Sequence, residues 1–127
     1  MNKIIAPVAL LSAVLAAALT MKTSAQAAPK PSSPEFFTAR VAPILQANCA
    51  ECHQGSHHRG GLSMNNKESL LKGGEDGPVI VPGHPEQSLL VKLIRQTDLS
   101  KHQKPMPPKG KLSDDDIHTI EQWIRAL

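Results

Sequence analysis

Only two cysteines occur among the 127 residues, and they lie three positions apart with a histidine directly after them: Cys49, Cys52 and His53. Two cysteines cannot form a disulfide framework. The chain is also poor in large side chains for a core, since its only aromatic residues are Phe36, Phe37 and Trp123. A domain with so small a core needs a further stabilising element, such as a metal or a large cofactor. We therefore expect the fold to be organised around a bound group at the cysteine pair.

The first 27 residues have the pattern of an export signal. Lys3 supplies a positive charge, an apolar run extends from Ile4 to Leu19, and residues 25–27 form a small-x-small cleavage site. An uncleaved membrane anchor is the alternative, but the run is shorter than the roughly 20 residues that cross a bilayer core. We expect residues 1–27 to be removed and the mature protein to be soluble in the periplasm, where thiol pairs are oxidised or otherwise occupied.

The mature part is expected to consist of a Pro/Ser linker, residues 28–33, and one domain, residues 34–127. Lys3 and Lys22 leave with the signal segment, so the net charge of +3 nearly disappears from the mature part. A nucleic-acid-binding function is therefore not expected.

Apolar residues recur at helical spacing in the first half of the domain. Ser33 is a predicted N-cap, and the helix after it should be kinked or restarted by Pro43 and should end at the cysteines. A loop rich in Gly and His follows. A short helix is predicted over residues 67–72, stopped by Gly73.

The second half of the domain predicts two more helices. One opens at Pro85 and ends near Gln96. The other starts after Ser113, which with Asp116 forms a capping box. Its apolar face is predicted to contain Ile117, Ile120, Trp123, Ile124 and Leu127. No segment alternates over the length of a strand, so the fold class is predicted to be all-α.

The Cys-x-x-Cys-His pattern of residues 49–53 is the attachment signature of c-type haem. The two thiols add to two vinyl groups on one edge of the porphyrin, and their separation matches the distance between those vinyls. His53 can then bind the iron from the proximal side. The sequence thus predicts one haem c, covalently attached at Cys49 and Cys52, which also supplies the large apolar group that the small core requires.

Three other interpretations use the same residues. A thioredoxin-type redox pair normally follows a strand in an α/β fold, which the helical pattern does not favour. A zinc site could combine the cysteines with His57 and His58, but a second ligand pair at zinc-finger spacing is missing. A disulfide between residues three apart would close too small a loop to stabilise much.

The second axial ligand of the iron is predicted to be Met106, which lies between prolines in Lys104-Pro105-Met106-Pro107-Pro108. Prolines restrict the loop, which lowers the cost of presenting a weak thioether ligand. His102 and His84 are the alternatives. Met64 is expected to pack against the haem or the first helix, whereas solvated positions are expected for His57, His58 and His118. Trp123 is expected to serve both as helix packing and as a wall of the haem pocket.

Together these residues resemble class I monohaem cytochromes c, and most closely the planctomycete-type cytochrome c domain. The likeness rests on residues 41–45, 49–53, 60–62, 82–85, 88–90, 106–108 and 123–124. It implies three to five helices wrapped around one haem, with the first and last helices crossing beside it. It also implies covalent attachment at Cys49 and Cys52 and axial ligation by His53 and Met106.

The predicted function is single-electron transfer between redox protein partners, without catalysis. No arrangement of catalytic residues is recognisable, and Asp114, Asp115 and Asp116 are interpreted as helix capping and dipole compensation. Two alternatives stay open: a haem subunit docked to a larger redox enzyme, and a haem peroxidase or gas sensor from which Met106 dissociates.

Four lysines surround the predicted ligand loop: Lys101, Lys104, Lys109 and Lys111. They are predicted to form a docking face for an acidic partner. A solvated, charged loop is the alternative.

Overall fold

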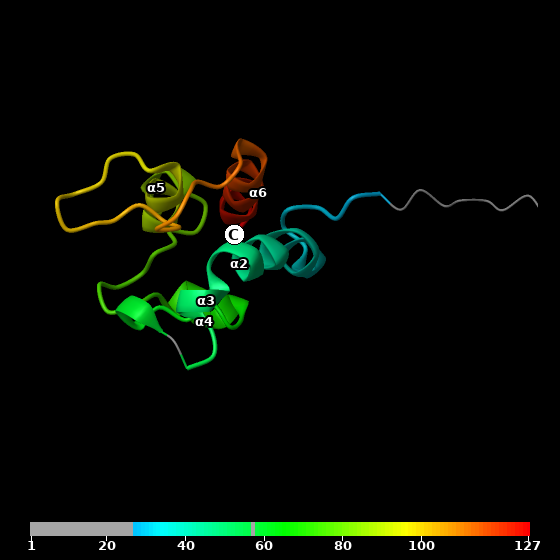
Figure 1. The fold of residues 1–127 in the computed structure, drawn as a ribbon. Helices are drawn as coiled ribbons and strands as arrows, with labels where there is room; N and C mark the ends of the chain where they lie inside the picture. Colours follow the sequence, from blue (N-terminus) through cyan, green and yellow to red (C-terminus); the bar gives the residue numbers. More distant parts are fainter. Residues whose placement is uncertain (1–26, 57) are drawn as a thin grey trace, which may run out of the picture.

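A computed structural model of the chain describes residues 27–56 and 58–127. Among these residues the regular secondary structure is helical, and one isolated β-bridge joins Gly74 and Gly77 (Figure 1). The prediction of an all-α fold is confirmed. No helix in the described part of the chain is both long and apolar enough for a membrane span. The predicted signal segment, apart from Ala27, lies outside the described residues.

The N-terminal helical segment runs almost without interruption from Pro34 to His53. It consists of α1 (Pro34–Phe36), a wide π turn η1 (Phe37–Val41), α2 (Ala42–Asn48) and α3 (Ala50–His53). Ser33 caps the start, since its hydroxyl accepts a hydrogen bond from the Phe36 N–H at 3.3 Å. The helix was predicted to end at the cysteines, and α3 continues it by one turn beyond Cys49.

Pro43 explains the π turn. A proline has no N–H and cannot make the usual helical hydrogen bond to the carbonyl four residues earlier. The chain widens just before it, so that the Ala42 N–H donates to the Phe37 carbonyl, and α2 starts with Pro43 in its first turn. The predicted restart of the helix at Pro43 is confirmed.

The last helix, α6 (Asp114–Arg125), supplies much of the core. The Ser113 hydroxyl caps it by accepting from the Asp116 N–H at 3.1 Å, as predicted. Its inward face is fully buried at Ile117, Ile120, Trp123 and Ile124. Leu127 does not belong to that face, because α6 ends at Arg125 and Leu127 is 39% exposed. That part of the prediction was wrong.

Two contacts hold α6 in place. The Trp123 ring lies 4.9 Å from the Phe37 ring, centroid to centroid, which joins α6 to η1. The Arg95 guanidinium donates to the Glu121 carboxylate at 2.5 Å, which joins α6 to α5 (Leu89–Arg95). The first and last helical segments therefore pack together, as the resemblance implied, and Trp123 is buried at their contact.

The middle of the chain contains shorter elements. α4 (Lys67–Lys72) has the predicted bounds, with the Asn66 side chain as its N-cap and Gly73 in a left-handed conformation after it. A short 3-10 turn, η2 (Arg59–Gly61), precedes it. The helix predicted from Pro85 is instead split into a 3-10 turn, η3 (Pro85–Gln87), and α5.

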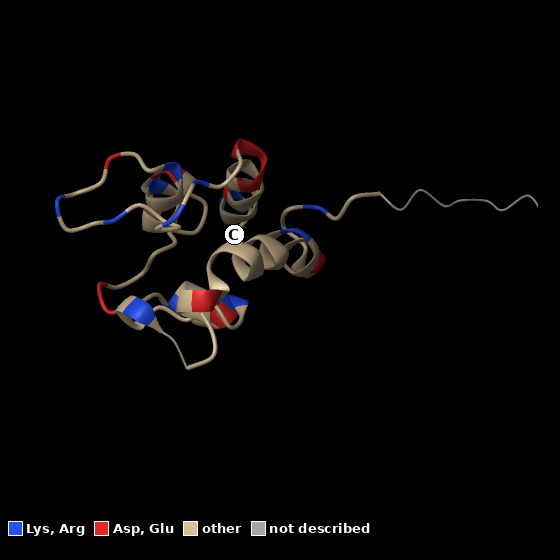
Figure 2. Cartoon of the chain, in the orientation of Figure 1, with Lys and Arg blue, Asp and Glu red and all other residues tan. Residues whose placement is uncertain are grey.

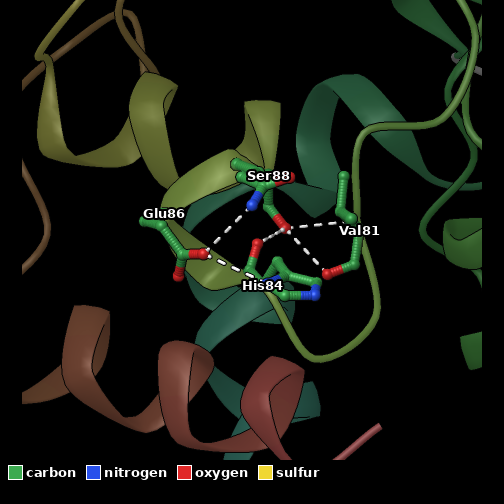
Figure 3. Close-up of polar contacts among 5 residues, drawn as sticks. Val81, His84, Glu86 and Ser88 are labelled. Atoms are coloured by element: carbon green, nitrogen blue, oxygen red, sulfur yellow. Dashed lines mark hydrogen bonds and ion pairs between the residues drawn. The ribbon is translucent and has the colours of Figure 1, made fainter.

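Ser88 causes that split. Its backbone is extended between η3 and α5, and its side chain is completely buried. The hydroxyl accepts from the Val81 N–H at 2.9 Å and lies 2.9 Å from the His84 carbonyl, to which it donates (Figure 3). Ser88 thereby closes the loop of residues 81–88 through its side chain, which a continuous helix would not allow.

The first prediction concerns this hydroxyl. Ser88→Ala leaves the N–H of the half-buried Val81 without its acceptor and removes one of two donors to the His84 carbonyl, the other being the Gln87 N–H, so we expect a loss of about 1–3 kcal/mol in the free energy of unfolding. Denaturant unfolding of the haem-loaded protein measures it. The exposed Ser100 gives the matched control, and Ser100→Ala should change stability by no more than about 0.5 kcal/mol. Equal midpoints for the two variants would contradict the role given to Ser88.

Candidate haem-attachment site

The cysteine pair lies on the single turn of α3. Cys49 is its N-cap, and its carbonyl accepts from the N–H groups of Cys52 at 3.1 Å and His53 at 3.0 Å. Residues three apart on a helical turn share a face, so the two thiols can reach one edge of a planar group. Both thiols are free and both residues are half-buried.

His53 is fixed at its backbone and at its ring. Its carbonyl accepts from the Met64 N–H at 2.7 Å, and its Nδ1 lies 3.3 Å from the Leu62 carbonyl oxygen. A carbonyl oxygen can only accept, so Nδ1 is the donor, and in the neutral imidazole Nε2 then keeps a free lone pair. That tautomer is the one in which an imidazole binds a metal through Nε2.

The thiol of Cys49 is not a reactive thiolate. Burial raises its pKa to about 11, and the nearby Cys52 contributes in the same direction. Cysteines of thiol redox enzymes have lowered pKa values, because the thiolate is the attacking form. The environment of Cys49 is therefore unlike that of a thioredoxin-type pair.

Met106 lies in the long loop between α5 and α6. It is half-buried, and its N–H donates to the Leu93 carbonyl of α5 at 3.0 Å. A second hydrogen bond, from the Gln96 side-chain amide to the Gly110 carbonyl at 3.0 Å, fastens the far part of the loop to the end of α5. The predicted restriction of this loop thus comes from hydrogen bonds to α5 as well as from its prolines.

Cys49 and Met106 pack on the same hydrophobic core. Both belong to a group of half-buried apolar side chains that surround the buried core residues, together with Phe37, Ile44, Leu62, Leu71 and Leu89. The residues present fit a haem c: two thiols one helical turn apart, an imidazole with a free Nε2, a thioether, and apolar surfaces that are only half covered.

The other sequence candidates occupy different positions. Met64 is buried in the core and lines a small space with Phe37 and Leu45, as expected for packing against the first helical segment. His84 and His102 are exposed, and the His84 ring contacts the Glu86 carboxylate at 3.3 Å. The expected solvated positions are found for His58 and His118, whereas His57 lies outside the described residues.

Among residues 27–56 and 58–127, no group of three or more His, Cys, Asp or Glu side chains is placed to hold a metal ion.

Leu62 and Gln54 contact His53 or its hydrogen-bonded partner Met64, a role that the sequence analysis did not assign to them. The Leu62 carbonyl accepts from His53, and the Gln54 side-chain amide donates to the Met64 carbonyl at 3.0 Å. A main-chain carbonyl is the same in every residue, so the residue type does not show that it will accept a hydrogen bond. The only indication in the sequence is the glycine pair at residues 60–61, because glycine allows backbone conformations that other residues rarely adopt.

One known family matches the part of the chain that contains the cysteine pair. Residues 49–110 match the model of the family described as planctomycete cytochrome C. No curated protein and no solved structure matches the chain. The matched segment starts at the first cysteine of the attachment signature and ends within the loop between α5 and α6, after Met106. A cytochrome c family implies haem c and electron transfer. This match covers just under half of the chain, and it confirms the expected resemblance to the planctomycete-type cytochrome c domain.

Proposed function

We propose that the protein is an exported, periplasmic electron carrier that holds one haem c through Cys49, Cys52, His53 and Met106. The observation that carries this proposal is the hydrogen bond between His53 Nδ1 and the Leu62 carbonyl, because it leaves Nε2 free to bind iron. The signal pattern of residues 1–27 supports export.

Each residue of the site has a separate task. When bound, haem c supplies an iron centre that cycles between two oxidation states by one electron. Cys49 and Cys52 would hold the porphyrin as thioethers, His53 would offer Nε2 to the iron, and Met106 would offer its sulfur from the loop attached to α5. A His/Met pair gives a higher reduction potential than a bis-His pair, which suits a carrier that passes electrons to a terminal acceptor.

Visible spectroscopy tests the assignment directly. The full chain, with its signal segment, is expressed in a host that matures c-type haem. We expect the pyridine haemochrome of a covalent haem c and, in the oxidised protein, the weak far-red charge-transfer band of methionine sulfur bound to iron. Absence of covalent haem would overturn the proposal, and covalent haem without the far-red band would shift the distal ligand to His102, His84 or an open site.

We further propose that the lysines of the methionine loop attract acidic redox partners. Lys101, Lys104, Lys109 and Lys111 are all exposed, and Figure 2 shows several blue positions and one red position along their otherwise tan loop. Most acidic residues lie outside this loop, and they include those at the start of α6 and around α3 and α4. Such asymmetry steers the approach of a charged partner toward one side of a protein.

Charge reversal measures this steering with small redox probes. Lys104→Glu combined with Lys109→Glu should slow electron transfer to an anionic hexacyanoiron complex and accelerate transfer to a cationic cobalt phenanthroline complex. Both differences should shrink as ionic strength rises, because salt screens exposed charges. The control is Lys30→Glu with Lys72→Glu, which changes the net charge equally at exposed sites outside the loop. Equal effects of the two pairs would refute the docking face.

A further inference from the structure

We propose that the turn of residues 73–77 is a positioning element for the proximal ligand His53. In this proposal Gly74, by lacking a side chain, lets the turn lie directly against residues 60–62 and so sets the position of the Leu62 carbonyl that accepts from His53 Nδ1. The inference rests on the proposed function, in which His53 Nε2 binds the haem iron. We call residues 60–64 the strap.

One end of the strap is fastened to the ligand and its neighbour. The Met64 N–H donates to the His53 carbonyl at 2.7 Å, and the Gln54 side chain donates to the Met64 carbonyl at 3.0 Å. Between these anchors and the turn lies the Leu62 carbonyl, 3.3 Å from His53 Nδ1. The main chain of the strap is therefore held close to His53, and the conformation of the strap decides where the Leu62 oxygen lies.

The other end of the strap is fastened to the turn. The Glu75 N–H donates to the Gly60 carbonyl at 2.8 Å. The turn itself is closed by two hydrogen bonds between Gly74 and Gly77, at 3.0 and 3.1 Å. Turn and strap are thus joined by a main-chain hydrogen bond, which requires their backbones to approach closely.

Glycine is what makes this approach close. A Cβ at Gly74 would lie 2.5 Å from the Gly60 carbonyl oxygen, 3.3 Å from the Leu62 nitrogen and 3.4 Å from the Leu62 Cβ. All three atoms belong to the strap, and a carbonyl oxygen at 2.5 Å is main chain that cannot swing aside as a side chain would. A methyl group at residue 74 would therefore displace the strap at the residue that contacts His53.

The hydrogen bond at Leu62 is sensitive to such a displacement. Its length of 3.3 Å is at the long end for an N–H donor, where a change of a few tenths of an ångström alters its strength markedly. A hydrogen bond on Nδ1 increases the basicity of an imidazole that binds metal through Nε2. A stronger bond to Leu62 would therefore stabilise the oxidised iron and lower the reduction potential, and a weaker bond would raise it.

Gly74→Ala is the test, read out by two measurements on the haem-loaded protein. The first is the proton chemical shift of the His53 Nδ1–H and its exchange with solvent, measured by NMR in the reduced state. The second is the reduction potential. We expect the two measurements to change together. A weaker hydrogen bond to Leu62 gives an upfield shift of the Nδ1–H resonance, faster exchange and a higher reduction potential. A stronger bond gives a downfield shift, slower exchange and a lower potential. A change of potential with an unchanged Nδ1–H resonance would overturn the proposal.

Gly77→Ala is the matched control from the same turn. Gly77 has a φ of +98°, so alanine strains the backbone there, but nothing lies within 4 Å of the added Cβ. Gly74 has no positive φ, so its substitution tests the contact without that strain. Gly77→Ala should destabilise the turn yet shift the Nδ1–H resonance less than Gly74→Ala does. An equal or larger shift in the control would refute the specific role of Gly74.

Gln54→Ala keeps the idea testable if Gly74→Ala does not fold. It removes the side-chain bond to Met64 and loosens the strap from the other end, so we expect the weaker-bond result, with an upfield Nδ1–H resonance and a higher potential. The covalent haem content distinguishes a failure of the proposed function from a failure of the positioning role. Wild-type protein without haem c would defeat the proposed function, whereas haem-loaded variants with unaltered His53 signals would defeat only the positioning role.

Discussion

Replacing Cys49 and Cys52 together by serine is expected to produce a chain without covalent haem that is largely unfolded. The physical reason is the size of the core. Its only aromatic residues are Phe36, Phe37 and Trp123, and a ring of apolar side chains around it is only half covered. Domains of this size rarely fold on their own core and need a covalent or metal-based staple. Far-UV circular dichroism and thermal melting of the double variant measure the loss.

A matched double substitution isolates the effect of the thiols. Ala39→Ser with Ala47→Ser places the same two side chains at exposed positions of η1 and α2. This control should keep its haem, its helical spectrum and its cooperative transition, at a cost of about 1 kcal/mol or less. The expectation fails if the cysteine-free chain melts cooperatively with native-like helicity.

Met106→Ala has the second large expected effect. The covalent haem should be retained, because Cys49, Cys52 and His53 are untouched, but the far-red band of the oxidised protein should disappear. The reduction potential should fall by a sizeable fraction of the roughly 0.8 V range that axial ligands control, since the thioether favours reduced iron. The reduced variant should also bind carbon monoxide at the vacated position.

His102→Ala is the comparison for this loop. His102 is exposed in the same loop, and its removal should leave the far-red band and the potential nearly unchanged. Persistence of the band without Met106 would overturn the assignment of Met106. Wild-type protein without the band, in which the potential changes in His102→Ala but not in Met106→Ala, would make His102 the ligand instead. Spectropotentiometric titration of both variants decides between the two.

Features signalled by side chains could be predicted from the sequence. The caps at Ser33 and Ser113, the stop at Gly73 and the restart at Pro43 each follow from what one residue type can or cannot bond, and each is found in the structure. The cysteine and histidine spacing led to the family in the same way, because the attachment chemistry fixes it.

Features built from main-chain atoms or long-range packing could not be predicted. The Leu62 carbonyl and the contact of Gly74 with the strap depend on backbone paths, and a carbonyl looks the same in every residue. The split between η3 and α5 depends on Ser88 reaching back to Val81, which local helical propensity does not describe. Leu127 continues the helical spacing, but α6 ends before it.

The π turn before Pro43 has a geometric effect on the attachment site. Phe37 and Cys49 are twelve residues apart, about three and a third turns of an α-helix, which would place them on different faces. A π turn accommodates one additional residue, so the effective spacing becomes eleven, close to three whole turns. The aromatic ring that contacts Trp123 and the first attachment cysteine thereby come into phase, as their shared packing on the core reflects. Pro43 interrupts the helix, and the π turn before it thus brings Phe37 and Cys49 to the same side of the helical segment.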